Sequence, residues 1–322
     1  MHRAANETAM PTAPVDPTPP RCADGVYTIC PTPFREDLSV DAGSIFTLVD
    51  FQIAAGVTGL AILGFMGEAH KLSTVERREV VAAFVAAARG RVPVWVGVRA
   101  LGIAGALEQA REAAALGAAA VFVAPLDQAS DALLFDYYAS LADALPIPVV
   151  IHDFPDSFGT ELSAELIARI GRESGVGFIK MEEPPVAQKI SRIRDLAGDR
   201  MRIFGGLGGV YFLEELQRGA IGTMTGFAFP EILIRIYDQF TGGDAAAAAR
   251  TFDRYCPLIR YEFQPKIGIA LRKYTYRRRG AIACDAVRAP GARIDPRSAA
   301  ELDAIVARVG LSLDTRGAFA LA

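Results

Sequence analysis

Gly175-Val-Gly-Phe-Ile-Lys180 is the stretch that decides the fold, because it belongs to a unit that recurs along the chain. In each copy an amphipathic helical stretch ends at a glycine, and a short run of β-branched or apolar residues follows. The clearest other copies are Gly56 before 58–63, Gly117 before 120–124 and Gly219 before 221–225. Glycine suits a helix end where the backbone turns left-handed, so the unit predicts a helix, a turn and a strand in that order.

Eight short runs of this kind predict eight strands. They lie near residues 26–30, 58–63, 93–97, 120–124, 147–152, 176–181, 202–206 and 221–225. Helical patterns such as 74–88 and 104–116 separate them, and roughly 20–30 residues per unit is the spacing of parallel strands joined by helices. We therefore predict an α/β fold, a (β/α)8 TIM barrel. A doubly wound open sheet is the alternative, because strand count alone does not prove closure.

The chain divides into three predicted regions. Residues 1–24 start with a stretch rich in proline, threonine and alanine and are expected to form a flexible N-terminal arm. Residues 25–242 hold the predicted barrel. Residues 243–322 are expected to form a C-terminal helical extension, with helices near 244–263 and 297–308.

The extension also carries a basic stretch over 272–279 that ends in Arg277-Arg-Arg279. Such a run could indicate nucleic-acid binding. One short cluster in a chain of net charge −3 is more often a solvated face or a subunit contact, and that is our interpretation.

Composition excludes several classes of protein. With 322 residues, 51% of them hydrophobic, most of the chain can bury a large core and is not disordered. The near-neutral charge favours a small-molecule ligand over nucleic acid or an anionic membrane. The four cysteines lack the spacing of a zinc site or a disulfide framework, and no apolar run has the length of a signal peptide or a membrane span. We expect a soluble cytoplasmic protein with reduced thiols.

The predicted sixth strand carries a lysine that can do chemistry. Alternation along a strand places Ile179 and Met181 on the face toward the helices, which leaves Lys180 and Glu182 facing the barrel interior. Catalytic groups of such barrels sit at the C-terminal ends of strands. Burial lowers the pKa of a lysine and frees its amine to attack a carbonyl carbon, whereas the alternative is a structural ion pair between Lys180 and Glu182 or Glu183.

The predicted fifth strand carries a histidine that faces the barrel interior, as Lys180 does on the sixth. Val149 and Ile151 face the helices, so His152 lies inward at the strand end, next to the strand of Lys180. An imidazole there can move protons during imine formation and breakdown at neutral pH. A hydrogen-bonded structural histidine is the alternative.

Two glycine-flanked turns follow predicted strands. In Gly64-Phe-Met-Gly67-Glu68 the backbone N–H groups can point at a carboxylate. Gly205-Gly-Leu-Gly-Gly209 can approach a substrate closely or cradle a phosphate. Either could also be an ordinary tight turn.

Together these segments resemble the dihydrodipicolinate synthase/N-acetylneuraminate lyase superfamily, from about residue 25 to residue 240. The matching motifs are Pro31-Thr-Pro-Phe34, Gly64-x-x-Gly67-Glu68, His152-Asp-Phe-Pro155 and Phe178-Ile-Lys180. Their order and spacing are more specific than any one motif. The resemblance implies that Lys180 is the lysine that forms a Schiff base with a 2-oxo acid.

The resemblance also implies the other site residues. His152 and Glu182 are the candidates for the general base beside Lys180. Backbone amides around Phe65 and Met66, flanked by Gly64 and Gly67, are expected to hold the substrate carboxylate, and Gly206 and Ile221 are expected to line the pocket. No metal ion or organic cofactor is expected, and a homotetramer is.

The chain departs from the family pattern in informative places. The paired threonines that bind the pyruvyl carboxylate are Phe65 and Met66 here, and the proton-relay tyrosine is His152. The arginine of synthases that take aspartate semialdehyde is missing from Asp156-Ser-Phe-Gly159, and their second tyrosine falls at Asp127. These changes disfavour 4-hydroxy-tetrahydrodipicolinate synthase activity.

The chain is more similar to the 2-keto-3-deoxy-sugar-acid dehydratases, notably those that act on the L-arabonate derivative. The similar segments are Lys180-Met-Glu182 with Pro184, Met224-Thr-Gly226 with Phe229-Pro230, and the tail from 257–259 through 300–303. The resemblance therefore implies a Schiff-base lyase, either a dehydratase or an aldolase, that acts on a 2-oxo acid.

Two other classes stay open. A metal-dependent barrel aldolase could use His70, His152, Glu68 and Asp153 as ligands. A non-catalytic barrel that only binds pyruvate or another 2-oxo acid is the second, since loss of the threonine pair could accompany loss of catalysis.

Overall fold

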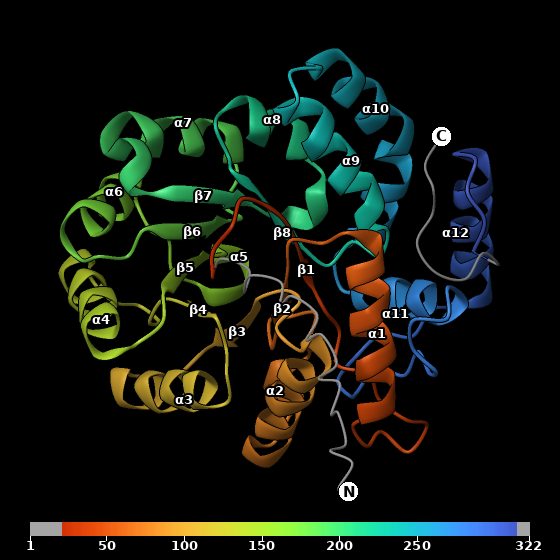
Figure 1. Cartoon of the computed structure of the whole chain (residues 1–322), viewed down its shortest axis with the longest axis horizontal. Helices are drawn as coiled ribbons and strands as arrows, with labels where there is room; N and C mark the ends of the chain where they lie inside the picture. The colour runs from red at the N-terminus through yellow and green to blue at the C-terminus, as the bar shows by residue number, and fades with distance from the viewer. Residues whose placement is uncertain (1–20, 314–322) are drawn as a thin grey trace, which may run out of the picture.

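The computed structural model describes residues 21–313, and its centre is a closed barrel of eight parallel strands (Figure 1). The strands pair in sequence order, and β8 pairs back to β1. They are β1 Gly25–Ile29, β2 Gly59–Ile62, β3 Val94–Val98, β4 Ala120–Val123, β5 Val149–Asp153, β6 Phe178–Met181, β7 Arg202–Gly205 and β8 Gly222–Thr225. The predicted barrel is confirmed, each strand lies within two residues of its predicted bounds, and the open-sheet alternative is wrong.

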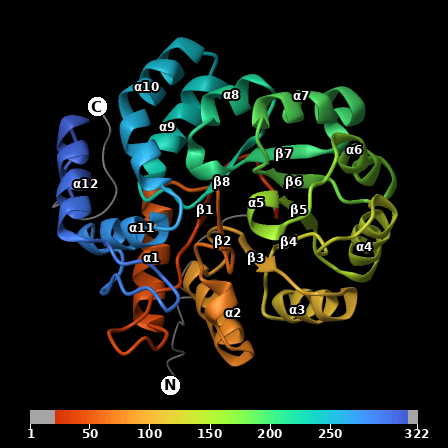
Figure 2. The ribbon, with the colours of Figure 1, turned by 180° about the vertical axis from the view of Figure 1, so that it is seen from behind.

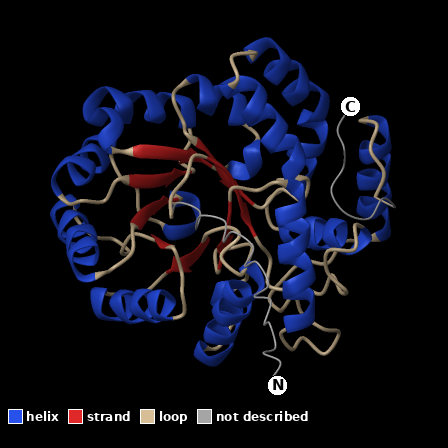
Figure 3. Cartoon of the chain, in the orientation of Figure 1, coloured by secondary structure: helices blue, strands red, loops and turns tan. Residues whose placement is uncertain are grey.

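Helices form a layer around the strands, as both opposite views and the colouring by secondary structure show (Figures 2 and 3). They are α1 Ala42–Ala55, α2 Thr74–Ala88, α3 Ile103–Ala115, α4 Asp131–Ala144, α5 Pro155–Phe158, α6 Ala164–Glu173, α7 Val186–Ala197, α8 Phe212–Gln217 and α9 Pro230–Thr241. Short 3-10 turns η1 Ala69–Lys71, η2 Gly198–Arg200 and η3 Leu207–Gly209 lie between them. The four glycines of the recurring unit all have φ between 79° and 98°, the left-handed conformation expected of them.

Strand alternation separates two packed regions. Ile179 and Met181 belong to the large core between the strands and the helices, together with Val149 and Ile151. A second, aromatic cluster fills the barrel interior, with Tyr27 and Trp95 ring centroids 4.4 Å apart. Because the interior is packed in this way, ligands reach the barrel only at its rims.

Three further helices follow α9, namely α10 Ala245–Glu262, α11 Gly268–Arg278 and α12 Pro296–Arg308. Helices α10 and α12 share a buried cluster with α8 and α9. Helix α11 lies beside α1 in both views, where Gln52 donates a hydrogen bond of 2.9 Å to the Tyr276 hydroxyl (Figures 1 and 2). The helices predicted near 244–263 and 297–308 are thus present. The division at residue 242 stays a prediction, and residues 1–20 of the predicted arm lie outside the described residues.

The basic run at the end of α11 is only partly the solvated face that its charge indicated, because Arg277 is exposed, Arg278 is half-buried and Arg279 is buried. Arg279 is fully buried, where it forms an ion pair with Glu231 and donates a 2.6 Å hydrogen bond to the carbonyl of Ala228. Arg277 and Arg278 form ion pairs with Asp285 and Asp303, respectively. Arg279 therefore joins the end of α11 to the barrel helix α9, whereas the ion pairs of Arg277 and Arg278 lie within the extension.

None of the helices in residues 21–313 is long and apolar enough to cross a membrane. The four cysteines all lie in this part of the chain and are free thiols, as their spacing predicted.

Candidate functional site

Strand pairing brings the two predicted catalytic strands together. In the register of β5 with β6, His152 is the direct partner of Lys180. Both side chains point inward near the C-terminal ends of their strands, and they are only 4% and 2% exposed, respectively. Both side chains therefore face the barrel interior, as the alternation along the strands predicted.

Lys180, His152 and Glu182 form a buried triad. The Lys180 ammonium donates a hydrogen bond to Glu182 Oε2. His152 Nε2 lies 3.0 Å from Lys180 Nζ and 3.1 Å from Glu182 Oε2. Each group is thus within hydrogen-bond distance of the other two, so a proton can pass among them without large movement.

The triad changes the pKa values of its members. Burial lowers the pKa of Lys180, although the Glu182 carboxylate opposes this shift. Burial, followed by the Lys180 charge, lowers the pKa of His152 to about 4. Burial alone would raise the pKa of Glu182, but Lys180 and His152 outweigh it and lower it to about 2. At neutral pH the imidazole is uncharged, and in the tautomer that leaves Nε2 unprotonated it accepts a hydrogen bond from the Lys180 ammonium.

Glu182 is held in place by the turn after β7. Its Oε1 accepts a hydrogen bond of 3.0 Å from the backbone N–H of Leu207. A Cβ atom at Gly206 would lie 2.3 Å from Glu182 Cγ, far inside van der Waals contact. Glycine at position 206 therefore makes the room in which the Glu182 side chain lies.

We expect Gly206→Ala to lower kcat by about tenfold to a hundredfold, because the added methyl displaces the Glu182 carboxylate from Lys180. Steady-state kinetics on the native substrate measures this. Gly177→Ala is the matched control, since its added Cβ would meet nothing closer than 3.7 Å. Equal kcat values for the two variants would contradict the role of Gly206.

Glu215 is a buried acid beneath the site that the sequence analysis missed. It accepts a 3.4 Å hydrogen bond from the backbone N–H of Gly206 on Oε1, and a Cβ atom at Gly205 would lie 1.7 Å from its Oε2. Burial, reinforced by Glu182, raises the pKa of Glu215 to about 8. The carboxyl group is therefore neutral at pH 7.

The raised pKa of Glu215 predicts a dependence of stability on pH. An unfolded chain releases this proton near the ordinary value of 4.5, whereas the folded chain keeps it up to about 8. The free energy of unfolding therefore falls as pH rises from about 4.5 to about 8. Glu215→Gln cannot titrate, so its stability relative to the wild type should increase across this window, by on the order of a few kcal/mol.

Urea unfolding of both proteins at pH 5, 6, 7 and 8 measures the difference. A difference that stays constant with pH would contradict the burial of an uncharged Glu215.

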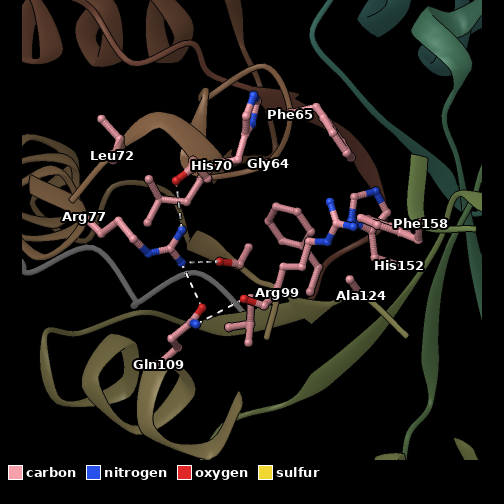
Figure 4. A pocket seen from close by; sticks show the side chains of 15 residues that line it. Gly64, Phe65, His70, Leu72, Arg77, Arg99, Gln109, Ala124, His152 and Phe158 are labelled. Carbon is pink, nitrogen blue, oxygen red and sulfur yellow. Dashed lines mark hydrogen bonds between the residues drawn. The ribbon is translucent and has the colours of Figure 1, made fainter. Parts of the chain in front are cut away.

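A cavity of about 270 Å³ opens beside His152 (Figure 4). Gly64, Phe65 and Phe158 line it, together with Arg77 and Arg99. No aspartate or glutamate is among the described residues that line the cavity. Such a lining favours an anionic ligand, and of the three triad residues His152 lines the cavity.

The other predicted site residues have mixed outcomes. Met66 is buried and does not line this cavity, and the carbonyl of Gly67 accepts a 2.6 Å hydrogen bond from Thr32 Oγ1. The structure does not bring Ile221 to the site. Its N–H donates to Ile203 and its carbonyl accepts from Gly25, just before β8 begins, so it lies at the opposite, N-terminal end of the barrel.

The metal-site alternative is contradicted by the placement of its candidate ligands. Glu68 forms ion pairs with Lys71 and Lys273, and Asp153 forms one with Lys189. Within residues 21–313, no three histidine, cysteine or acidic side chains lie where they could together hold a metal ion.

Two arginines near the site were not singled out from the sequence. Arg99 directly follows β3 and lies over the Phe158 ring, 5.1 Å from its centroid. Its position after a strand end is the signal that could have found it. Arg272 comes from α11, and its charge acts on both Lys180 and Glu182. No strand-end rule could have placed it here.

Comparison with known proteins matches this chain to one family model and to relatives with two different named activities. The model of the dihydrodipicolinate synthetase family matches residues 23–309. The chain is 32% identical to an L-2-keto-3-deoxyarabonate dehydratase of Azospirillum brasilense, over 88% of this chain and 94% of that protein. It is also 32% identical to a 4-hydroxy-tetrahydrodipicolinate synthase of Hyphomonas neptunium, over 87% of this chain and 96% of that protein.

The crystal structure of a dihydrodipicolinate synthase from Rhodopseudomonas palustris superposes with a TM-score of 0.84 at 33% identity. The match covers 90% of this chain and 98% of that one.

Proposed function

Since this chain belongs to the dihydrodipicolinate synthetase family, we propose that it is a lyase whose Lys180 forms a Schiff base with a 2-oxo acid. The observation that carries the proposal is the buried Lys180 amine, in contact with both His152 and Glu182 at the C-terminal end of the barrel. Burial disfavours the ammonium form, and the two neighbours can take up the proton that the amine must lose before it attacks.

The first half of the reaction forms the imine. Lys180 passes a proton to Glu182 or His152, and its neutral Nζ adds to the C2 carbonyl carbon of the substrate. The C2 oxygen takes up one proton from the newly bonded Nζ and one from the same pair of residues, and it leaves as water. The protonated imine that results draws electrons from C3 and makes the C3 hydrogens acidic.

The second half is dehydration. A base removes one C3 proton, and the C4 hydroxyl leaves with a proton as water, so that a C3–C4 double bond forms. Hydrolysis of the imine then returns a 2-oxo acid with one water less and restores Lys180. The aldol alternative removes the C4 hydroxyl proton instead and cleaves the C3–C4 bond, which gives pyruvate and an aldehyde.

We favour dehydration of a 2-keto-3-deoxy sugar acid. The Azospirillum dehydratase and the Hyphomonas synthase match this chain at the same identity and over nearly the same length, so the preference depends on the residues of the site. The cavity beside His152 adds support, because Gln109, His70 and Arg99 line it and offer hydrogen-bonding groups to a hydroxylated chain. Glu182 and His152 are the candidates for the base, as each lies within reach of the Lys180 amine.

Synthase activity is the second candidate, since relatives of that name match most of the chain. Asp127 and the stretch 156–159 stand where the synthases carry a tyrosine and an arginine, which argues against it. A barrel that binds pyruvate without turnover is the third candidate. A homotetramer stays part of the proposal, and size-exclusion chromatography with light scattering tests it.

One assay separates the candidate reactions. The protein is incubated with 2-keto-3-deoxy-L-arabonate, substrate and products are followed by proton NMR, and pyruvate is followed with lactate dehydrogenase. The proposal predicts loss of water without release of pyruvate. Release of pyruvate would indicate an aldolase, and condensation of pyruvate with aspartate semialdehyde in a parallel sample would indicate a synthase. No turnover of any of these compounds would contradict the proposed chemistry.

A further inference from the structure

Arg272 on α11 is a buried guanidinium with unused hydrogen-bonding capacity. The residue is 7% exposed, and neither Nε nor Nη2 has a hydrogen-bond partner among the described residues. Its Nη1 lies 3.1 Å from the thioether sulfur of Met66, which is a weak acceptor. Buried polar groups in folded proteins are almost always hydrogen-bonded. Two donor nitrogens without an acceptor on one buried guanidinium therefore indicate that a hydrogen-bond acceptor is missing.

Glu262 does not fill that need. Its Oε2 lies 3.9 Å from Arg272 Nε, which is beyond hydrogen-bond distance. Both of its carboxylate oxygens are already engaged, one by the N–H of Ala228 at 2.9 Å and the other by the hydroxyl of Thr275 at 3.0 Å. Glu262 thus offsets part of the charge of Arg272 without satisfying its donors.

The position of Arg272 links it to the site. It contacts Met66, and the adjacent Phe65 lines the cavity beside His152. Neither of these two side chains can donate a hydrogen bond to an anion. Arg272 is also close enough to Lys180 for its charge to lower the pKa of that amine. A carboxylate attached to the carbon that bonds Lys180 would lie in the field of this guanidinium.

We propose that Arg272, a residue of the C-terminal extension, binds the carboxylate of the 2-oxo acid whose C2 carbon bonds Lys180. The planar guanidinium offers the two N–H groups that a carboxylate accepts side by side, and burial strengthens this charged interaction. The inference rests on the proposed function and extends it, because it makes α11 part of the substrate site.

The test compares pyruvate with pyruvamide, its uncharged analogue. Each compound is titrated in the presence of cyanoborohydride. Intact-protein mass spectrometry then gives the concentration at which half of the protein molecules carry the reduced adduct. The wild type should require much less pyruvate than pyruvamide. Arg272→Met should reduce this preference by about tenfold or more, because only the acid loses a charged partner.

The preference ratio is the half-maximal concentration of pyruvamide divided by that of pyruvate. Both concentrations are measured on one protein sample, so a smaller folded fraction does not change their ratio. Arg272→Gln keeps hydrogen-bond donors without the charge, and it serves the same comparison if the methionine variant does not fold. Arg277→Met is the control, because that arginine lies on the same helix and forms an ion pair with Asp285 at the surface. Its ratio should equal that of the wild type.

An unchanged ratio in the Arg272 variants would overturn this inference and leave the proposed function intact. Absence of any adduct in the wild type would overturn both.

Discussion

Lys180→Arg is expected to lower kcat by about 10⁴-fold or more while the protein stays folded. Arginine keeps the positive charge that pairs with Glu182, but a guanidinium does not lose its proton near neutral pH and cannot form an imine. The loss should therefore appear in turnover and not in the unfolding transition. Steady-state kinetics and thermal unfolding of the same preparation measure the two effects.

Lys189→Arg is the matched control for this substitution. Lys189 forms ion pairs with Asp153 and Glu183, and neither it nor these partners belongs to the triad. Its arginine variant should retain near wild-type turnover. Lys180→Ala is less informative, because it leaves Glu182 buried without its partner and costs about 3–5 kcal/mol of stability. Residual activity of Lys180→Arg within tenfold of the wild type would contradict the mechanism.

Glu182→Gln is expected to lower kcat by about 10²- to 10⁴-fold, because the amide cannot take up or return a proton. Its carbonyl oxygen can still accept the hydrogen bond from Leu207, so the turn after β7 should keep its shape. Loss of the carboxylate also removes the charge that raises the pKa of Lys180. The amine should therefore become neutral at lower pH than in the wild type.

Two measurements together test this prediction. Turnover should fall, while reductive trapping of pyruvate on the variant should extend to more acidic pH than on the wild type. Glu183→Gln is the control, since Glu183 pairs with Lys189 and not with Lys180. A variant in which trapping shifts to higher pH, or in which kcat is unchanged, would show that Glu182 does not act on the amine.

The fold and the centre of the site could be predicted from the sequence because both depend on local periodicity. Alternation of apolar residues around Lys180 fixes its direction, and the same alternation fixes His152. Adjacent strands of a parallel barrel end at the same rim, so the two inward side chains had to lie close together.

Strand alternation does not determine at which end of the barrel Ile221 lies. It directly precedes β8, and a residue at a strand start belongs to the opposite rim, whatever the sequence motif around it.

The residues that sequence reasoning missed depend on long-range packing. Glu215 is buried only because α8 lies under the glycine turn after β7, and nothing in its own segment indicates a neutral acid. Arg272 reaches the site because α11 packs against the turn after β2, where Arg272 contacts Met66 and Lys273 forms an ion pair with Glu68. Helical periodicity does place Arg272, Tyr276 and Arg279 on one face, and all three are buried. The spacing of these residues thus indicates a buried face, whereas the charge of the run indicates exposure.

The central claim is that the buried amine of Lys180 bonds the substrate, and peptide mapping after borohydride reduction tests it most directly. The protein is reduced with borohydride in the presence of pyruvate, digested, and analysed by tandem mass spectrometry. The account predicts one modified lysine, Lys180, and no modification without the 2-oxo acid. An adduct confined to other lysines, or no adduct under conditions that support turnover, would contradict it.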